Sequence, residues 1–371
     1  MPTPAPSFFA LSATQKRVLE TIWRHGAISR VDIAKATGLT GASATRLVRD
    51  LEERGLTVDR VQHDGARGQP SRPVSLAANG AYALGVNFSH AYVDVGLVSL
   101  AGEVAGHERI PLAEPTPHRI GALAAEAFER LRRRTGVPLK RTVGAGFSVP
   151  GDFISPNRLN AHAYFPAFAE VDVQAVFASS MPVPVVIEND AASAALGERV
   201  HGLGRRFDSF VLVHVGHGIG SGLVLSGQLH RGFHLNAGLL GVAFPMDQPR
   251  PSGQDLFAAL AEFGIPANDF DVLDSLDLEH PAVSSWLERA GAQLAEGLAV
   301  PIRMIDPQAV ILGGRLPPRF LEALYRRTPL GEVLDRSSPL PSPTFAVSEL
   351  GAFAGVIGAA SACFFHTFFA I

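Results

Sequence analysis

Apolar residues recur every three or four positions through the first 55 residues, which is the spacing of one face of a helix. Three such stretches open with residues that cap helices, Ser12, Ser29 and Thr40, and a glycine follows each stretch. Two short strand-like stretches come next, at residues 56–61 and 73–76. Three short helices followed by a two-stranded wing predict a winged helix-turn-helix over residues 1–78.

The third of these predicted helices has a polar face opposite its apolar stripe. Short hydroxyls and guanidinium groups make up the polar face: Ser43, Thr45, Arg46 and Arg49. Groups of this kind near the start of a helix contact base edges and phosphates in the major groove of DNA. We therefore predict that these four residues bind DNA, the alternative being a solvated face on a small helical domain.

The segment between the two wing strands is rich in turn residues and carries Arg67 and Arg72. A flexible segment with arginines suits a narrow minor groove, where the negative potential is high, and a plain linker is the alternative. Charge supports the DNA-binding hypothesis, because residues 1–78 hold 11 Lys and Arg against 7 Asp and Glu while the whole chain has a net charge of −3.

From residue 81 the apolar residues form runs of strand length separated by polar turns. An amphipathic stretch at residues 120–133 has the spacing of a helix. Strands alternating with helices predict an α/β body. The predicted strands lie at residues 81–86, 92–99, after the turn at 101–104, and at 142–149, 185–187, 210–215 and 309–314.

Three polar residues, Glu188, Asn189 and Asp190, follow one of these strands and precede an alanine-rich stretch with helical propensity. Open α/β sheets bind ligands at the carboxyl ends of their strands, so these side chains are candidates for reading a small molecule. A plain helix cap is the alternative, because Asn and Asp are common at helix starts. After residue 215, a glycine at every second position would let backbone amides approach an anion.

Cys363 is the chain's one cysteine, which excludes an internal disulfide framework and a zinc site built on several thiolates, and favours a reducing compartment. Residues 1–10 lack the basic start and apolar core of a signal peptide, so we expect a cytoplasmic protein. Residues 351–371 contain no Asp, Glu, Lys or Arg. Their small residues and the lack of basic flanks favour a helix buried between layers over a membrane span.

The order of these features is more specific than any one of them. The winged helix-turn-helix, two strands joined by a turn, the Pro150-Gly151 loop, Glu-Asn-Asp, the glycine-rich run and Leu312-Gly313-Gly314 together resemble the ROK family (repressors, open reading frames and sugar kinases) over nearly the whole chain. The resemblance implies a two-lobed, actin-like ATPase fold of the ribonuclease H-like type. It implies a first lobe of residues 79–190, completed by a C-terminal helix of residues 351–371, and a second lobe of residues 191–350.

For ligand binding, the resemblance points to Asn189 and Asp190. In the family's kinases the sugar lies between the lobes, the residue matching Asp190 takes a proton from it, and the residue matching Asn189 hydrogen-bonds it. A carboxylate placed at a hydroxyl suits recognition as well as catalysis. We predict ligand contacts from Gly151, Asn160, His162, Glu188, Asn189 and Asp190.

The sequence also departs from the kinases of the family. They carry Asp-x-Gly-Gly-Thr in the first turn, where the Asp works with Mg²⁺ and the glycines admit phosphate, whereas this chain has Asn87-Phe88-Ser89-His90. His217 stands where the kinases usually carry Thr in the second loop. We therefore predict no nucleotide cofactor and interpret five residues as remnants of phosphate loops: Asn87, Ser89, Gly216, Gly218 and Gly220.

The zinc signature of the family is missing too. Leu239 and Val242 replace a sugar-binding Glu and a His that serves both sugar and metal, and the family's cluster of cysteines is missing from the residues that follow. We predict no metal, because no recognised pattern fits the spacing of His214, His217, His230 and His234. The two lost partners also predict poor binding of an ordinary hexose, since an unpaired buried hydroxyl costs about 1 to 3 kcal/mol.

These observations favour a DNA-binding transcriptional regulator, acting as a repressor, whose body senses a sugar or another small molecule and is not an enzyme. The predicted partners are operator DNA, the effector, and further copies of the chain in a homodimer or homotetramer, with no membrane. Two alternatives remain: a bifunctional ATP-dependent sugar kinase that also regulates transcription, and a DNA-bound scaffold whose body binds a protein.

Overall fold

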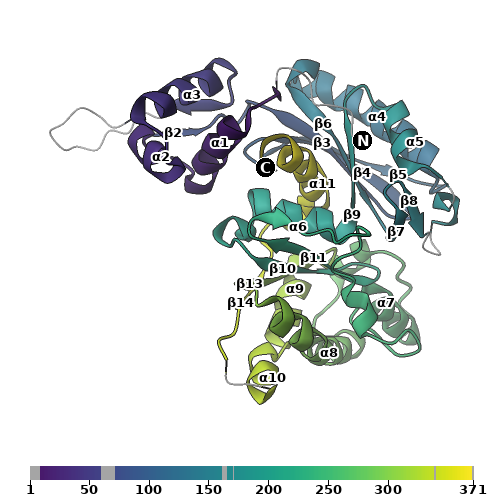
Figure 1. The fold of residues 1–371 in the computed structure, drawn as a ribbon. Helices are drawn as coiled ribbons and strands as arrows, with labels where there is room; N and C mark the ends of the chain where they lie inside the picture. The colour runs from purple at the N-terminus through teal and green to yellow at the C-terminus, as the bar shows by residue number, and fades with distance from the viewer. Residues whose placement is uncertain (1–8, 60–71, 161–164, 170, 338–339, 370–371) are drawn as a thin grey trace. The chain divides into compact units, whose positions relative to one another are not determined.

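A computed structural model describes residues 9–59, 72–160, 165–169, 171–337 and 340–369 of the chain (Figure 1). The chain forms two compact units. Unit 1 comprises Met1–Val149, Val171–Glu188 and Ala359–Ile371, and unit 2 comprises Pro150–Glu170 and Asn189–Gly358. Each unit contains a five-stranded sheet.

Unit 1 begins with the predicted winged helix-turn-helix, and the caps explain where its helices start. The side chains of Ser12, Ser29 and Thr40 each accept a hydrogen bond from the backbone N–H three residues on. Two antiparallel strands form the wing. The elements are α1 (Ala13–His25), α2 (Arg30–Thr37), α3 (Gly41–Glu53), β1 (Thr57–Asp59) and β2 (Val74–Leu76).

The sheet of unit 1 has the strand order β5-β4-β3-β6-β9, with β3 antiparallel to β4 and parallel to β6. Neighbouring residues of β6 face opposite sides: Phe147 stacks on Phe177 of α5, whereas a Cβ on Gly146 would overlap the carbonyl oxygen of Ala359. The sheet therefore lies between α4 and α5 on one face and the C-terminal helix on the other (Figure 1). The elements are β3 (Tyr82–Phe88), β4 (Tyr92–Ser99), β5 (Val104–Pro111), α4 (Pro117–Thr135), β6 (Thr142–Val149), α5 (Val173–Ser180) and β9 (Val185–Asn189).

The C-terminal helix, α11 (Ala354–Phe364), continues as a π-helical turn (Phe365–Phe369). The segment Gly351–Phe369 is long and apolar enough to cross a membrane, but 67% of its most apolar stretch is buried inside the protein. This burial agrees with the predicted core helix. The bare backbone at Gly146 is what admits the helix so close to the sheet.

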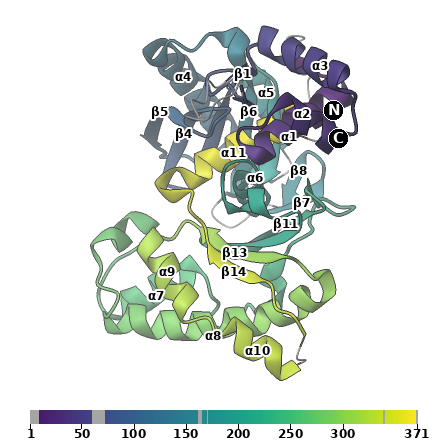
Figure 2. The ribbon, with the colours of Figure 1, turned by 90° about the vertical axis from the view of Figure 1, so that its left-hand side faces the viewer.

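Unit 2 contains the second sheet, in the order β12-β11-β10-β13-β14. β10 pairs antiparallel with β11 and parallel with β13. The helix α6 lies on one face of this sheet, and α8 and α9 lie on the other (Figures 1 and 2). The elements are α6 (Asp190–His201), β10 (Phe210–Val215), β11 (Ile219–Leu225), β12 (Gln228–Leu229), α7 (Gly253–Glu262), α8 (Pro281–Ile305), β13 (Ala309–Gly314), α9 (Pro318–Arg326), α10 (Leu330–Ser337) and β14 (Thr344–Val347).

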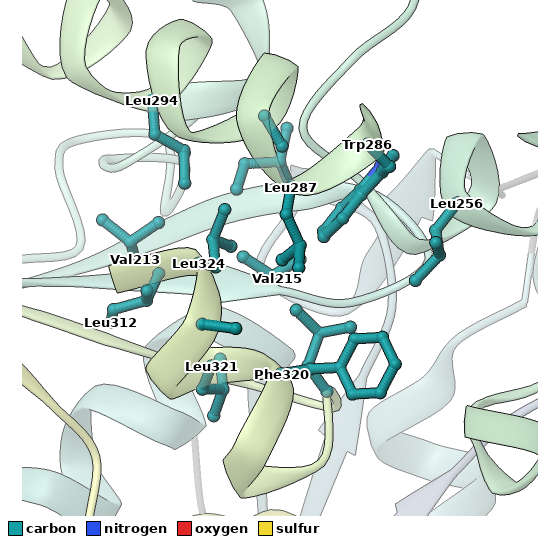
Figure 3. Packing of buried hydrophobic residues seen from close by; sticks show 14 of the residues in the cluster. Val213, Val215, Leu256, Trp286, Leu287, Leu294, Leu312, Phe320, Leu321 and Leu324 are labelled. Carbon is teal, nitrogen blue, oxygen red and sulfur yellow. The ribbon is translucent and has the colours of Figure 1, made fainter. Parts of the chain in front are cut away.

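Alternating side chains of β10 enter two apolar clusters. Val213 and Val215 pack in a cluster with Trp286 of α8 (Figure 3), whereas Leu212 packs with Ala195 of α6. A strand that is buried on both faces has a continuous run of apolar residues, and this run is what predicts β10 from the sequence.

The unit boundaries differ from the predicted lobe boundaries. The prediction assigned residues 150–170 to the first lobe, but they belong to unit 2. The hairpin of β7 (Asp152–Ser155) and β8 (Arg158–Asn160) explains the difference. The N–H of Phe153 donates to Oδ1 of Asn236 (2.8 Å), and its carbonyl accepts from Nδ2 of Asn236 (2.8 Å), so the hairpin is tied to unit 2.

Candidate functional site

The exposed face of α3 carries four of the predicted DNA-binding residues. Thr45, Arg46 and Arg49 are exposed, and Ser43 is half-buried. Three of the four bond to neighbours on the helix: Ser43 to Thr40, Thr45 to Gly41, and Arg49 to Glu53. Within the part of the chain that the structure describes, Arg46 has no partner, so its guanidinium is the most available donor on this face.

A residue that sequence reasoning missed holds the wing against the helices. Arg30 of α2 pairs with Glu52 of α3 at 2.6 Å and with Asp59 of β1 at 2.8 Å. Its Nη1 also donates to the carbonyl of the exposed Arg72 (3.5 Å), which lies at the base of the wing. Nothing in the spacing of Arg30 signals this role. Arg67 lies outside the described residues.

Asn189 precedes α6 and uses its side chain to join two elements. Its Oδ1 accepts from the backbone N–H groups of Ala191 (2.9 Å) and Ala192 (3.3 Å), and its Nδ2 donates to the carbonyl of Gly151 (3.0 Å). Gly151 has a φ of 101°, and a Cβ there would lie 2.9 Å from the carbonyl oxygen of Asn160. The helix cap that was the alternative interpretation is therefore present, and it also fixes the loop before β7.

Asp190 is half-buried at the start of α6 and interacts with His214 near the end of β10. Burial lowers the pKa of His214, Asp190 opposes this and Arg315 adds to it, so the imidazole is neutral near pH 7. Nδ1 of His214 is buried without a hydrogen-bond partner among the described residues. A carboxylate beside a neutral imidazole can accept from and donate to the hydroxyls of a ligand.

Glu188 was predicted to contact the ligand, and the structure gives it a partner within unit 1. The residue is 4% exposed, and its Oε1 lies 3.2 Å from Nε2 of His366 in the π-helical turn. Glu188 thus connects β9 to the C-terminal helix. Of the other predicted ligand contacts, Asn160 is exposed on β8, and His162 lies outside the described residues.

The turn between β3 and β4 uses its own polar groups. Oγ of Ser89 accepts from the backbone N–H groups of Ala91 (3.0 Å) and Tyr92 (3.3 Å). Asn87 lies within β3, opposite Asp94 of β4. The backbone N–H groups of Ala91 and Tyr92 are therefore bonded within the turn itself.

The glycine-rich run forms a hairpin turn and a strand rather than an open loop. The N–H of Gly216 donates to the carbonyl of Gly218 (3.0 Å), and Gly220 lies in β11. A Cβ on Gly222 would lie 2.5 Å from the carbonyl oxygen of Ala191. The glycine spacing predicts an approach to an anion, whereas in the structure Gly222 lets α6 pack closely on the strand.

Sequence comparison finds relatives along most of the chain. The profile of the ROK family matches residues 83–255, and that of the MarR family matches residues 11–65. The uncharacterized protein y4fQ of Sinorhizobium fredii is 37% identical over 363 residues, which cover 97% of this chain and 92% of y4fQ. The xylose repressor of Bacillus spizizenii is 24% identical over 323 residues, 83% of each protein. The N-acetylglucosamine repressor of Escherichia coli O6:H1 is 23% identical over 328 residues, 81% of this chain and 79% of that protein.

Solved structures share the fold. A ROK family transcriptional regulator, described as a homolog of the Escherichia coli MLC protein, matches with a TM-score of 0.72 at 22% identity, over 95% of this chain and 96% of that one. The ROK hexokinase from Thermus thermophilus matches with a TM-score of 0.58 at 24% identity, over 77% of this chain and 98% of that one. The fold predicted from the sequence, a winged helix-turn-helix followed by a sugar-kinase-like body, is confirmed.

Proposed function

The chain belongs to the ROK family and carries a MarR-type winged helix-turn-helix, and on this basis we propose that it is a DNA-binding transcriptional regulator acting as a repressor. The observation that carries the proposal is the exposed polar face of α3, opposite a stripe of buried Ala44, Leu47, Val48 and Leu51. A helix with this division packs on one side and reads DNA on the other. Operator DNA is the proposed partner.

Selection of binding sites from a DNA library, followed by affinity measurements at fixed salt, tests this function. Arg46→Ala should weaken binding to the selected operator by about 1 to 3 kcal/mol and relax the preference at one base position. Lys35→Ala is the matched control, because it removes an exposed positive charge from α2 of the same domain. Equal operator binding by Arg46→Ala and wild type would mean that this face does not read the DNA.

We infer that the effector is a sugar or sugar derivative held by Asp190 and His214 of unit 2. The carboxylate and the neutral imidazole supply an acceptor and a donor for hydroxyl groups. Leu239 and Val242, which are 40% and 83% exposed, add no polar partner. The effector should therefore be less hydroxylated than a free hexose, or differently substituted.

Thermal unfolding with a panel of monosaccharides and their N-acetyl derivatives identifies the effector. The panel begins with xylose and N-acetylglucosamine, because two relatives are named xylose repressor and N-acetylglucosamine repressor. Asp190→Ala should abolish both the melting shift and the effect of the sugar on operator binding, whereas Glu262→Ala, an exposed carboxylate of the same unit, should leave both intact. If no sugar shifts the melting temperature while DNA binding is retained, the scaffold alternative gains support.

We propose that the body does not transfer phosphate. Positioning and neutralising the phosphates make up most of that catalysis. The backbone N–H groups of Ala91, Tyr92 and Gly216 are bonded within their own turns, which supports the proposal that these loops hold no phosphate. A sugar kinase is the second candidate, because the body shares the fold of the ROK hexokinase. An ATP-coupled assay decides between them: turnover that disappears in Asp190→Ala would establish the kinase.

We propose that two copies of the chain act together on a palindromic operator in the cytoplasm. A two-fold assembly presents two α3 helices to half-sites one helical turn or a multiple apart. Mass photometry of the DNA complex should then give about twice the chain mass of 39.3 kDa in addition to the DNA.

A further inference from the structure

An arginine of the body contacts the C-terminal end of α3, the proposed recognition helix for DNA. Arg141 directly precedes β6, whose first residue, Thr142, pairs with Tyr82 of β3. The winged domain and the body are joined at residues 78–81, just before Tyr82. The pairing of Thr142 with Tyr82 therefore places Arg141 beside this junction. Its Nη1 donates to the carbonyl of Arg54 (2.8 Å) and to that of Gly80 (3.0 Å).

The end of α3 and two nearby glycines favour the contact with Arg141. Arg54 caps the C-terminal end of α3, where the last carbonyls lack helical partners and carry partial negative charge. Gly55 has a φ of 68°, and a Cβ there would lie 2.9 Å from Nη2 of Arg141. A Cβ on Gly80 would lie 2.5 Å from the carbonyl oxygen of Gly55. The two glycines let the segments approach closely enough for one guanidinium to bridge them.

The winged domain has a second attachment within unit 1. Trp23 of α1 lies against Phe369 with 4.9 Å between ring centroids, and Phe9 meets Phe368 at 5.7 Å. All four rings are at most 3% exposed. The winged domain therefore contacts the rest of unit 1 at two places, through polar groups at the end of α3 and through aromatic rings at α1.

We propose that Arg141 is a positioning residue for DNA recognition: it clamps the end of α3 to the body, so the body sets the direction of the recognition helix. This inference rests on the proposed function. Two DNA-binding domains held rigidly by their bodies bind well only when the half-sites have a matching separation, whereas domains on flexible tethers accept many separations.

Operators whose half-site separation changes one base pair at a time test the clamp. Lys140→Ala is the matched control, since it removes the exposed charge next to Arg141. Wild type and Lys140→Ala should show one sharp optimum. Arg141→Ala should bind the best-spaced operator roughly tenfold more weakly, with a flattened dependence on separation. Arg141→Lys should recover part of the optimum, because an ammonium can still reach one carbonyl.

A variant that is merely destabilised loses affinity equally at all separations, so the shape of the profile is the decisive readout. An Arg141→Ala profile as sharp as that of wild type overturns the proposal. Affinity for a single half-site should change by less than about twofold, because the residues that touch DNA are intact.

Time-resolved fluorescence anisotropy tests the clamp without DNA. A dye is attached at Lys35→Cys, where the native side chain is 75% exposed, while the native Cys363 is buried. In this Lys35→Cys protein, Arg141→Ala should add a fast nanosecond component to the decay that the labelled parent and its Lys140→Ala variant lack. Identical decays contradict the clamp. If the decays differ but no protein binds DNA from the library, the proposed function has failed, whereas the attachment of the winged domain to the body by Arg141 is supported.

Discussion

Three consecutive residues where β9 meets α6 have three different partners. Glu188 meets His366, Asn189 caps α6 and holds Gly151, and Asp190 interacts with His214. The sequence could place Asn189 and Asp190 at a helix start, because an alanine-rich stretch follows them. It could not predict the partner of Glu188, which is 178 positions away.

Asn189→Ala should destabilise unit 2 by about 1 to 2 kcal/mol, because it removes a helix cap together with the bond to Gly151. Urea unfolding followed by the fluorescence of Trp286 in a Trp23→Phe background measures the loss. Asn189→Asp keeps the capping oxygen and should lose only the smaller share. Asn160→Ala, on the exposed hairpin strand, should stay within about 0.5 kcal/mol of wild type. A loss as large in Asn160→Ala would mean that the cap is not the cause.

Acid should destabilise the protein through His201 in the last turn of α6. Burial, aided by Arg205, lowers the pKa of His201 to about 3. The unfolded imidazole takes up a proton below about pH 6.5 and the folded one does not, so stability is full above that pH and is lost as the pH falls. The loss between pH 7 and pH 5 should reach up to about 2 kcal/mol.

Urea unfolding at both pH values measures this loss. His201→Gln should remove most of the difference between them, whereas His118→Gln, at an exposed position of α4, should keep it. An unaltered pH dependence in His201→Gln would assign the effect to other groups.

At the scale of elements, the winged helix-turn-helix and the apolar strands were predictable, because caps and apolar runs are local signals. β11 was not, since its glycines resemble a phosphate loop and their real contacts come from α6. The hairpin of β7 and β8 was missed as well. It is short and polar, and its attachment to unit 2 depends on Asn236, far along the chain.

Gly222→Ala should destabilise unit 2 by about 1 to 3 kcal/mol, the usual range for overpacking. The added methyl would lie 2.5 Å from the carbonyl oxygen of Ala191 and 2.5 Å from the Cβ of Ala195, so α6 must move off β11. Gly218→Ala is the control from the same run, because a Cβ there meets nothing within 4 Å. Thermal unfolding compares the two, and equal melting temperatures would show that the helix does not need this glycine.

The contact between Glu188 and His366 should contribute to the stability of unit 1. A double-mutant cycle with Glu188→Gln, His366→Ala and the combined variant should give a coupling of about 0.5 to 2 kcal/mol in urea unfolding, because the carboxylate is buried beside the imidazole. The combined variant should be more stable than the sum of the single losses predicts. Additive losses would show that the two side chains are independent.

At the scale of the whole molecule, the chain passes between the two units four times, after Val149, Glu170, Glu188 and Gly358. Neither unit is therefore one continuous stretch of sequence. Patterns along the chain cannot locate such crossings, because each depends on which distant segments pack together. Unit 1 holds Trp23 and unit 2 holds Trp286, so each unit has its own fluorescent probe.

Leu287→Ala should lower the unfolding midpoints reported by both tryptophans. Leu287 is fully buried in the core of unit 2 (Figure 3), where such a truncation costs about 2 to 5 kcal/mol. Two segments of unit 1, Val171–Glu188 and Ala359–Ile371, are connected along the chain to unit 2. Unfolding of unit 2 releases the ends of these segments, so the unfolding of unit 1 should follow it. Trp23→Phe and Trp286→Phe backgrounds separate the signals. A midpoint that moves only for Trp286 would show that the units unfold independently.

The winged domain is synthesised first, but its packing depends on the C-terminal helix, which is synthesised last. Residues 359–371 leave the ribosome only after all of unit 2 has been made, yet Phe368 and Phe369 are the rings that cover Phe9 and Trp23. A nascent chain can thus form its three N-terminal helices early but cannot seat them until translation has passed the helix. Chains that terminate early would expose these aromatic rings, a surface that chaperones and proteases recognise, and so would be removed before they could occupy an operator.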